Sequence, residues 1–217
     1  LPCSNPNDLK ETIEMLRRSK TIRQINLLVD SDFKVAERAD DCTTIVVDNL
    51  LSTDTMRKVS ENAEADYVLL ALKSTPLVLG QHALDRLLRV ATDTHAALVY
   101  SDYHAVVDGK REQHPVIDYQ MGSLRDDFDF GSLLFIRADL LHEYVATCGK
   151  EGGHQFAFAG LYDLRLFLSR KGELFHINEY LYTAEEFDTR KSGERQFDYV
   201  NPRNREVQIE MEKAVTL

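Results

Sequence analysis

The stretch Ala65–Pro76, which reads ADYVLLALKSTP, constrains the fold of this chain more than any other. Its segment Asp66–Leu72 carries a continuous apolar run bounded by charge, and Pro76 follows closely. A short apolar run with a breaker behind it is typical of a strand buried on both faces, as in the middle of an α/β sheet. Ligands of open α/β sheets bind just beyond the carboxyl ends of such strands. We therefore expect Ala71–Thr75 to lie where chemistry takes place.

Length and charge narrow the class of protein. A chain of 217 residues can bury one sizeable α/β core and is short for two. The formal net charge of -10 argues against nucleic acid or an anionic membrane as the main partner. No apolar run is long enough to predict a transmembrane segment. Because the sequence starts without Met and ends inside a helical pattern, we expect a domain of a longer chain, with further domains as neighbours.

Strand and helix patterns alternate in the first half of the sequence, which predicts right-handed βαβ units and a mostly parallel sheet. The second half is mixed. The expected strands are Ile25–Val29, Thr43–Val47, Asp66–Leu72, Ala96–Tyr100, Leu133–Ile136 and Leu174–Ile177. The expected helices start at Asn5-Pro6 and at Ser52 or Thr53, and cover residues 80–92, 138–148, 161–171 and 205–217. We expect residues 1–204 to form one domain and the helix 205–217 to lead out of it.

Several short motifs occur in an order and spacing that is similar to one known family. They are VDSD at Val29–Asp32, YSD at Tyr100–Asp102, DGKR at Asp108–Arg111 with Pro115, FIR at Phe135–Arg137, and YDLRL at Tyr162–Leu166 with Gly172 and Leu181-Tyr182. Together they resemble the inverting family 2 glycosyltransferases, in particular the O-antigen and rhamnan-type branch. The resemblance implies an α/β fold of the GT-A type: a Rossmann-like three-layer sandwich with a mostly parallel central sheet and a mixed C-terminal half.

The resemblance also implies an activity. Such enzymes transfer a hexosyl group, with inversion, from a nucleotide-diphosphate sugar to a glycan or lipid-linked acceptor. Here the setting would be polysaccharide synthesis in the bacterial cytoplasm, with peripheral membrane association as a second option. The reaction needs a carboxylate to accept the acceptor's proton. It also needs positive charge on the departing diphosphate, which the family takes from Mg²⁺ or Mn²⁺ held by an Asp-x-Asp motif.

Two positions depart from the family pattern. The place of the Asp-x-Asp motif reads Ala71-Leu72-Lys73, and the Glu-Asp pair that supplies the base falls on Gly160-Leu161. Neither place holds a carboxylate. We therefore predict no metal ligands in this chain and leave a requirement for a divalent metal open.

Two acids are the predicted candidates for proton transfer. Asp163 matches the motif two positions beyond Gly160-Leu161, in the first turn of a predicted helix, where the dipole favours its anionic form. Its alternative role is an ion pair with a neighbouring arginine. Asp102 ends a predicted strand at the same edge of the sheet, and its alternative role is to form a turn before Asp108-Gly109.

Five residues are predicted to bind the nucleotide-sugar donor: Ser4, Asp30, Lys73, Arg190 and Lys191. Asp30 follows a strand, where a carboxylate can accept from a ribose hydroxyl or a base N–H group. Lys73 would face the diphosphate as a fixed cation in place of a metal. The last two lie in a basic run that could close over the donor. Each has a plainer alternative, as a turn-forming acid or as a solvated surface cation.

Two other functions remain open from the sequence. The missing acids favour a GT-A domain that has lost catalysis and serves as a binding or scaffold module of a larger protein. A nucleotidyltransferase of related fold ranks last, because it needs a glycine-rich phosphate loop after the first strand and Leu1–Asn7 contains no glycine.

Overall fold

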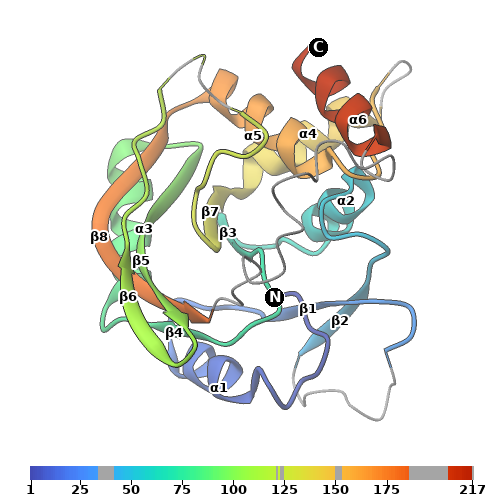
Figure 1. Cartoon of the computed structure of the whole chain (residues 1–217). Coiled ribbons are helices and arrows are strands. Elements are labelled where there is room, and N and C mark those ends of the chain that lie inside the picture. Colours follow the sequence, from blue (N-terminus) through green and yellow to red (C-terminus); the bar gives the residue numbers. More distant parts are fainter. Residues whose placement is uncertain (34–41, 121, 123–124, 150–152, 186–204, 217) are drawn as a thin grey trace.

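The computed structural model of the chain describes residues 1–33, 42–120, 122, 125–149, 153–185 and 205–216, and Figure 1 shows their arrangement. The described helices are α1 (Lys10–Arg18), α2 (Thr53–Glu61), α3 (Ala83–Thr94), α4 (Ala138–Cys148), α5 (Gly160–Lys171) and α6 (Arg205–Val215). The described strands are β1 (Asn26–Val29), β2 (Thr43–Val46), β3 (Tyr67–Ala71), β4 (Leu77–Leu79), β5 (Leu98–Val107), β6 (Lys110–His114), β7 (Leu133–Arg137) and β8 (Leu174–Glu185).

The strands form two sheets. β1 and β2 pair in parallel, and a second, curled sheet runs β3-β7-β5-β8-β4, with β6 paired to β5. In this sheet β5 and β8 are parallel, whereas β3–β7, β5–β7, β5–β6 and β4–β8 are antiparallel. The expectation of a mostly parallel sheet is therefore corrected to a mixed one. Crossover helices predict which strands run the same way, but not that the antiparallel β7 inserts between β3 and β5.

The strand predicted for the middle of the sheet is found, but at an edge. β3 pairs with β7 on one side and ends the order of its sheet. Tyr67, Val68 and Leu69 are half-buried, and Leu70 and Ala71 are buried. An apolar run shows that both faces of a strand are covered, not that both of its edges are paired, so the sequence could not reveal this position.

Several element boundaries differ from those expected. Asn5 does not cap α1, which begins one turn later at Lys10; Asn5 Oδ1 instead accepts from the N–H of Asn7 at 3.1 Å, within a turn. β8 continues to Glu185, well beyond the predicted Ile177, because it follows β5 across an irregularity in register. The hairpin predicted at Asp108-Gly109 is confirmed, with φ of +50° and +75°, the left-handed conformation that its turn type requires.

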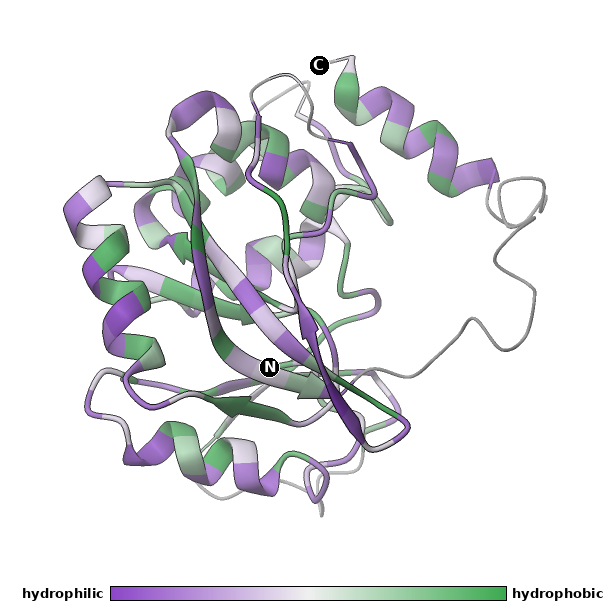
Figure 2. Cartoon of the chain, turned by 60° about the vertical axis from the view of Figure 1, so that its left-hand side comes forward, coloured by the Kyte–Doolittle hydropathy of each residue, from purple (hydrophilic) through white to green (hydrophobic). Residues whose placement is uncertain are grey.

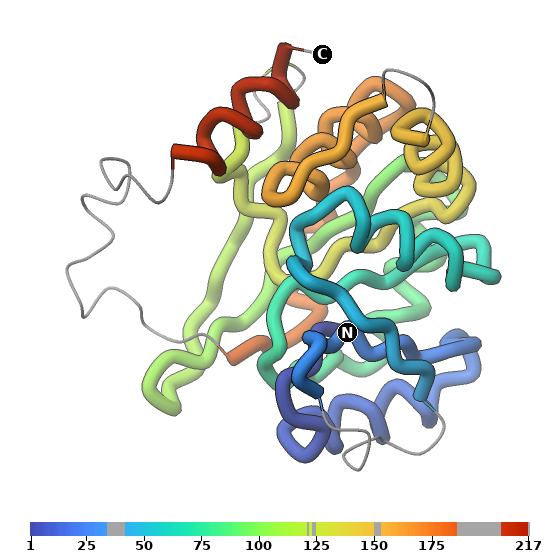
Figure 3. Tube along the Cα trace, turned by 90° about the vertical axis from the view of Figure 1, so that its right-hand side faces the viewer, coloured from blue at the N-terminus to red at the C-terminus, as the bar shows by residue number. Residues whose placement is uncertain are grey.

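Helices α4, α5 and α2 lie together on one side of the sheet, and α3 lies near the other side of the curl (Figure 1). Figure 2 shows β6, whose sequence is KREQH, as a hydrophilic strand at the outside, which suits an exposed edge. Helices α1 and α6 lie at opposite ends of the molecule (Figure 3). Among the described residues, no helix has the length and apolar character needed to cross a bilayer.

The two sheets meet along the N-terminal residues. Leu1–Cys3 runs beside β1: the N–H of Leu28 donates to Leu1 O, and that of Cys3 to Leu28 O, each at 2.8 Å. A cavity of about 280 Å³ lies between β1 and β3 and is lined by residues of both strands.

Candidate functional site

A cavity of about 570 Å³ opens where β1, β2 and β3 end. We call it the strand-end pocket. It lies at the carboxyl edge of strands that belong to both sheets, which is the usual place for a ligand in an α/β fold. Its polar and charged lining residues are Ser4, Asp30, Asp48, Lys73, Ser74, Thr75 and Glu185.

Three of the predicted donor-binding residues meet in this pocket. Ser4, Asp30 and Lys73 come from segments far apart in the sequence, and all three line the cavity. Asp30 directly follows β1, and its Oδ1 accepts from the N–H of Asp32 at 3.1 Å, which holds the carboxylate in a local turn. Lys73 and Ser74 are exposed. Arg190 and Lys191 lie outside the described residues.

Sequence reasoning missed two of the charged lining residues. Asp48 follows the predicted strand Thr43–Val47 as Asp30 follows its own, so the same strand-end rule could have found it. Glu185 carried no such signal, because β8 was expected to end eight residues earlier. Ser74 and Thr75 belong to the stretch Ala71–Thr75 that was expected at a site, although neither was given a role; Thr75 is 8% exposed.

Three carboxylates line the strand-end pocket, those of Asp30, Asp48 and Glu185, but the described residues do not group them to hold one metal ion. Mg²⁺ and Mn²⁺ prefer carboxylate and other oxygen ligands. At the end of β3 stand Ala71 and Leu72, which have no donor atoms in their side chains, and Lys73, a cation. Within the part of the chain that the structure describes, no three His, Cys, Asp or Glu side chains are grouped to hold a metal ion. These residues do not fit the metal that the fold family implies.

Asp102 does not line the strand-end pocket; it is 1% exposed inside the sheet. Its Oδ1 accepts from the N–H of Val116 at 2.9 Å and lies 2.9 Å from His176 Nε2. The other ring nitrogen of His176 lies 2.6 Å from Asp118 Oδ1. The two ring nitrogens of His176 therefore lie within hydrogen-bond distance of two carboxylates, one on β5 and one in the segment 116–119. Asp102 thus helps to pin the segment 116–119 to β5.

Tyr100 completes this attachment. Its ring stacks on that of His176 with centroids 5.0 Å apart. Its hydroxyl donates to Ile117 O at 2.9 Å and accepts from the N–H of Tyr119 at 2.8 Å. Burial raises the pKa of Tyr100 to about 12, so the hydroxyl keeps the proton that it donates. The YSD motif therefore makes structural contacts through both its first and its last residue.

Asp163 also lies away from the lining of the strand-end pocket. It stands in the first turn of α5, and its Oδ2 accepts from Tyr144 Oη at 2.9 Å. Burial raises the pKa of Asp163 above its ordinary value, although the hydrogen bond from Tyr144 acts in the opposite direction. The nearest acid to the family's base position is therefore a buried partner of α4.

The base position itself is closed by packing. A Cβ on Gly160 would overlap backbone atoms of Ser52 and Thr53 at the start of α2. Main-chain hydrogen bonds hold the two helix starts together at this point: the N–H of Leu161 donates to Leu51 O, and that of Thr53 to Phe156 O, each at 2.9 Å. Leu161 is 5% exposed. We call this contact the α2–α5 junction.

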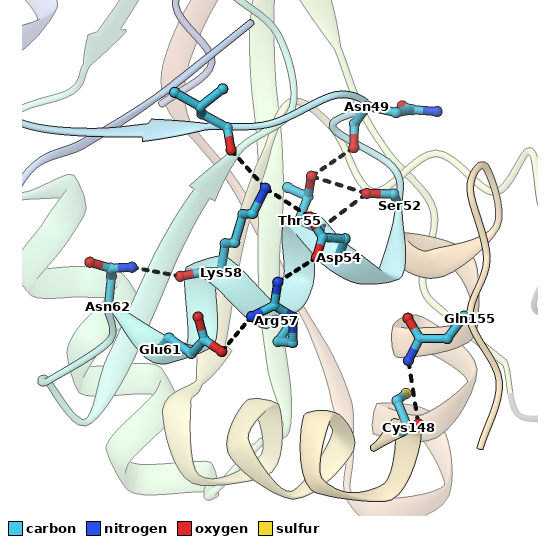
Figure 4. A network of polar contacts seen from close by, with 11 residues as sticks. Asn49, Ser52, Asp54, Thr55, Arg57, Lys58, Glu61, Asn62, Cys148 and Gln155 are labelled. Carbon is cyan, nitrogen blue, oxygen red and sulfur yellow. Dashed lines mark hydrogen bonds and ion pairs between the residues drawn. The ribbon is translucent and has the colours of Figure 1, made fainter. Parts of the chain in front are cut away.

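Capping contacts fix the α2 side of the junction (Figure 4). Ser52 Oγ accepts from the N–H of Thr55 at 3.1 Å, and Thr55 Oγ1 donates to Asn49 O at 2.7 Å. Lys58, one turn on, donates to Val46 O of β2 at 2.9 Å and pairs with Asp54. These bonds satisfy helix-end groups and tie α2 to the sheet.

Helix α6 caps the other side. The carboxylate of Glu210 accepts from the N–H groups of Ala157, Phe158 and Ala159, at 3.1, 2.7 and 3.1 Å. These donors lie just before α5, where the helix dipole favours negative charge. The Glu210 side chain thus accepts the hydrogen bonds of the backbone N–H groups just before α5.

Comparison with known proteins rests on structure alone. No protein-family model matches the sequence, and no curated protein is recognisably similar to it. Among solved structures, residues 1–349 of S. aureus TarS in complex with UDP are similar, with a TM-score of 0.54 and 11% identity. The match covers 85% of this chain and 59% of the TarS chain, so this chain spans less than two thirds of that structure. The likeness confirms the α/β GT-A fold class; the rhamnan-type branch stays a prediction.

Proposed function

We propose that the chain binds a nucleotide-diphosphate sugar in the strand-end pocket and transfers the sugar, with inversion, to a glycan or lipid-linked acceptor. The supporting observation is the meeting of Ser4, Asp30 and Lys73 in one cavity at the ends of three strands. The setting we propose is polysaccharide synthesis in the bacterial cytoplasm. TarS has been solved with UDP, which makes a uridine nucleotide the first ligand to test.

The charges of the pocket suggest an orientation for the donor. Asp30 and Asp48 follow β1 and β2, and carboxylates accept hydrogen bonds from ribose hydroxyls and base N–H groups. Lys73 and Ser74 follow β3 and supply a cation and a hydroxyl. We place the nucleoside against the two carboxylates and the diphosphate against the end of β3.

Neither residue predicted for proton transfer lines the strand-end pocket. Asp163 and Asp102 remain the predicted candidates, and each is already engaged in buried hydrogen bonds. Glu185 is a third candidate, because it lines the strand-end pocket itself. A base must come within hydrogen-bond reach of the acceptor hydroxyl, and a residue of the pocket meets that condition most directly.

A binding module without catalysis is the second candidate function. The observation that favours it is the α2–α5 junction, where backbone contacts at Gly160 leave no space for the family's acid. Such a module would keep the donor pocket and bind a nucleotide sugar without turning it over.

One experiment separates the candidates. Thermal shifts are measured with UDP, other nucleoside diphosphates and nucleotide sugars, and bound sugars are then assayed for release or transfer. Asp30→Asn should lose the shift, whereas Asp32→Asn, two residues away and outside the pocket lining, should keep it. Stabilisation with turnover supports the enzyme, and stabilisation without turnover supports the module. No stabilisation by any nucleotide would contradict both.

A further inference from the structure

The end of β3 carries hydrogen-bonding groups that the described structure leaves unsatisfied. Thr75 lines the strand-end pocket and is more than nine-tenths buried, yet its Oγ1 has no hydrogen-bond partner among the described residues. Within the same described part of the chain, the backbone N–H groups of Ser74 and Thr75 make no hydrogen bond. Buried polar groups are normally paired, so each such group requires an explanation.

These groups of Ser74 and Thr75 lie on one short turn. Residues 73–75 form a bend between β3 and β4, which places the positive charge of Lys73 next to two hydroxyls and to two backbone N–H groups that have no partner within the described residues. Successive backbone N–H groups in a turn form a concave site that suits phosphate oxygens. A staggered rotation of the Thr75 side chain about χ1 would carry its hydroxyl to a new direction.

The same turn replaces the metal site of the fold family. Ala71 is paired within the sheet to Leu133, and Leu72 donates its N–H to Ser132 O at 3.0 Å, so this backbone is held in place. Lys73 then stands where the family carries a metal-binding acid. An ammonium group at this place can neutralise charge on phosphate oxygens, as a divalent ion bound by the acid would.

From this geometry, and resting on the proposed function, we propose that the turn Lys73–Thr75 binds the diphosphate of the donor directly, without a divalent metal ion. Lys73 neutralises charge on the diphosphate. Ser74 and Thr75 donate hydrogen bonds to its oxygens through their N–H and hydroxyl groups.

The test is titration of UDP into the whole chain by calorimetry, with EDTA and then with Mn²⁺. We expect dissociation constants that agree within about twofold. Lys73→Gln should weaken UDP binding about tenfold, which corresponds to about 1.4 kcal/mol, and Lys73→Arg should largely restore it. Lys110→Gln is the matched control, because it removes the same charge from the exposed strand β6, away from the pocket.

The hydroxyl is tested separately. Thr75→Val keeps the shape of the side chain and should weaken UDP binding about fivefold, whereas Thr75→Ser should bind like the unchanged chain. Melting curves of each variant show whether it is folded. Binding that requires Mn²⁺, or that Lys73→Gln and Lys110→Gln alter equally, overturns the inference and leaves the proposed function standing. Failure of the unchanged chain to bind any nucleotide overturns both.

Discussion

The strand-end pocket and the α2–α5 junction are the two places where a GT-A fold would carry out its chemistry, and they have opposite structures. The pocket is an open cavity of about 570 Å³ lined by polar side chains from both sheets. The junction is filled by backbone packed on backbone, with a glycine at its centre. A single substitution can change the chemistry of a side chain in an open pocket. At the closed junction, an acidic side chain cannot be introduced without moving two helices.

This difference separates two kinds of missing acid. At the end of β3 the place predicted for the acid holds Lys73, a charged side chain that lines the cavity. At the start of α5 the place predicted for the base holds Gly160, where a Cβ would overlap backbone atoms of α2. The first change is compatible with continued donor binding by other means. The second indicates that position 160 itself cannot carry the base.

The largest effect is expected at the junction. Gly160→Ala would drive a methyl group into the backbone of α2 and should lower the free energy of unfolding by about 3 kcal/mol. Urea denaturation followed by circular dichroism measures the loss. Gly149→Ala is the control, because its Cβ would lie no closer than 3.6 Å to other atoms, and it should change stability little. Equal stability of the two variants would show that the junction is not closed.

The next effect concerns the attachment of α6 to the junction. Glu210→Gln removes the charge that three backbone N–H groups share, and should cost about 2 kcal/mol. The loss should be local, so the readout is faster amide exchange in α6 and at residues 157–159. Glu212→Gln on the same helix is the control. Unchanged exchange in the first variant would mean that the carboxylate does not fasten α6.

At the open pocket, the effect should fall on binding and not on folding. Asp30→Asn removes an anionic acceptor from the cavity and should weaken nucleotide affinity about tenfold, or 1.4 kcal/mol. The melting temperature without ligand should stay nearly constant, because Asp30 is exposed. A large fall in stability with no change in affinity would reverse the comparison between pocket and junction.

The smallest effect is a dependence of stability on pH. Burial raises the pKa of Asp163, so the folded protein holds this proton more tightly than the unfolded chain. Stability from this group is complete below the ordinary carboxyl pKa and falls as pH rises through the raised value. Asp163→Asn should therefore be as stable as the unchanged chain in acid and more stable than it at pH 7.

Asp139 provides the opposite case. It lies in the first turn of α4, as Asp163 does in α5, and its pKa is lowered by a hydrogen bond from Arg137. Asp139→Asn should lose stability at neutral pH and keep it in acid, which is the reverse sign. Urea midpoints measured between pH 4 and pH 7 check both variants. If the urea midpoints of the two variants change in the same direction with pH, the burial of Asp163 does not control its ionisation.

Local patterns predicted much of the fold. Ala138–Cys148 was expected to be helical and is exactly α4, and Ser52 caps α2 as its position suggested. Apolar runs located β1, β2, β3 and β7 to within a residue or so. The edge position of β3 and the length of β8 depend on which strands pair, and pairing joins residues too distant for local patterns to report.

Part of the candidate site could also be predicted from local patterns. Ser4, Asp30 and Lys73 line one cavity, as expected from strand ends that meet at one edge of a sheet, and their role in binding stays a prediction. Thr75 was placed there by the stretch Ala71–Thr75 but given no role, because only the structure shows that its hydroxyl has no partner among the described residues. Gly160 marked a missing acid in the sequence, and only the packing shows that the position requires a glycine.

The division into two sheets has a mechanical consequence for the strand-end pocket. Asp30 extends from the β1–β2 sheet and Lys73 from the sheet that β3 ends, and a cavity separates the two strands below. A ligand that contacts both residues would connect the two sheets. We expect β1 and β2 to unfold locally, as a separate unit, in the free protein. With the ligand bound, we expect the two sheets to unfold together.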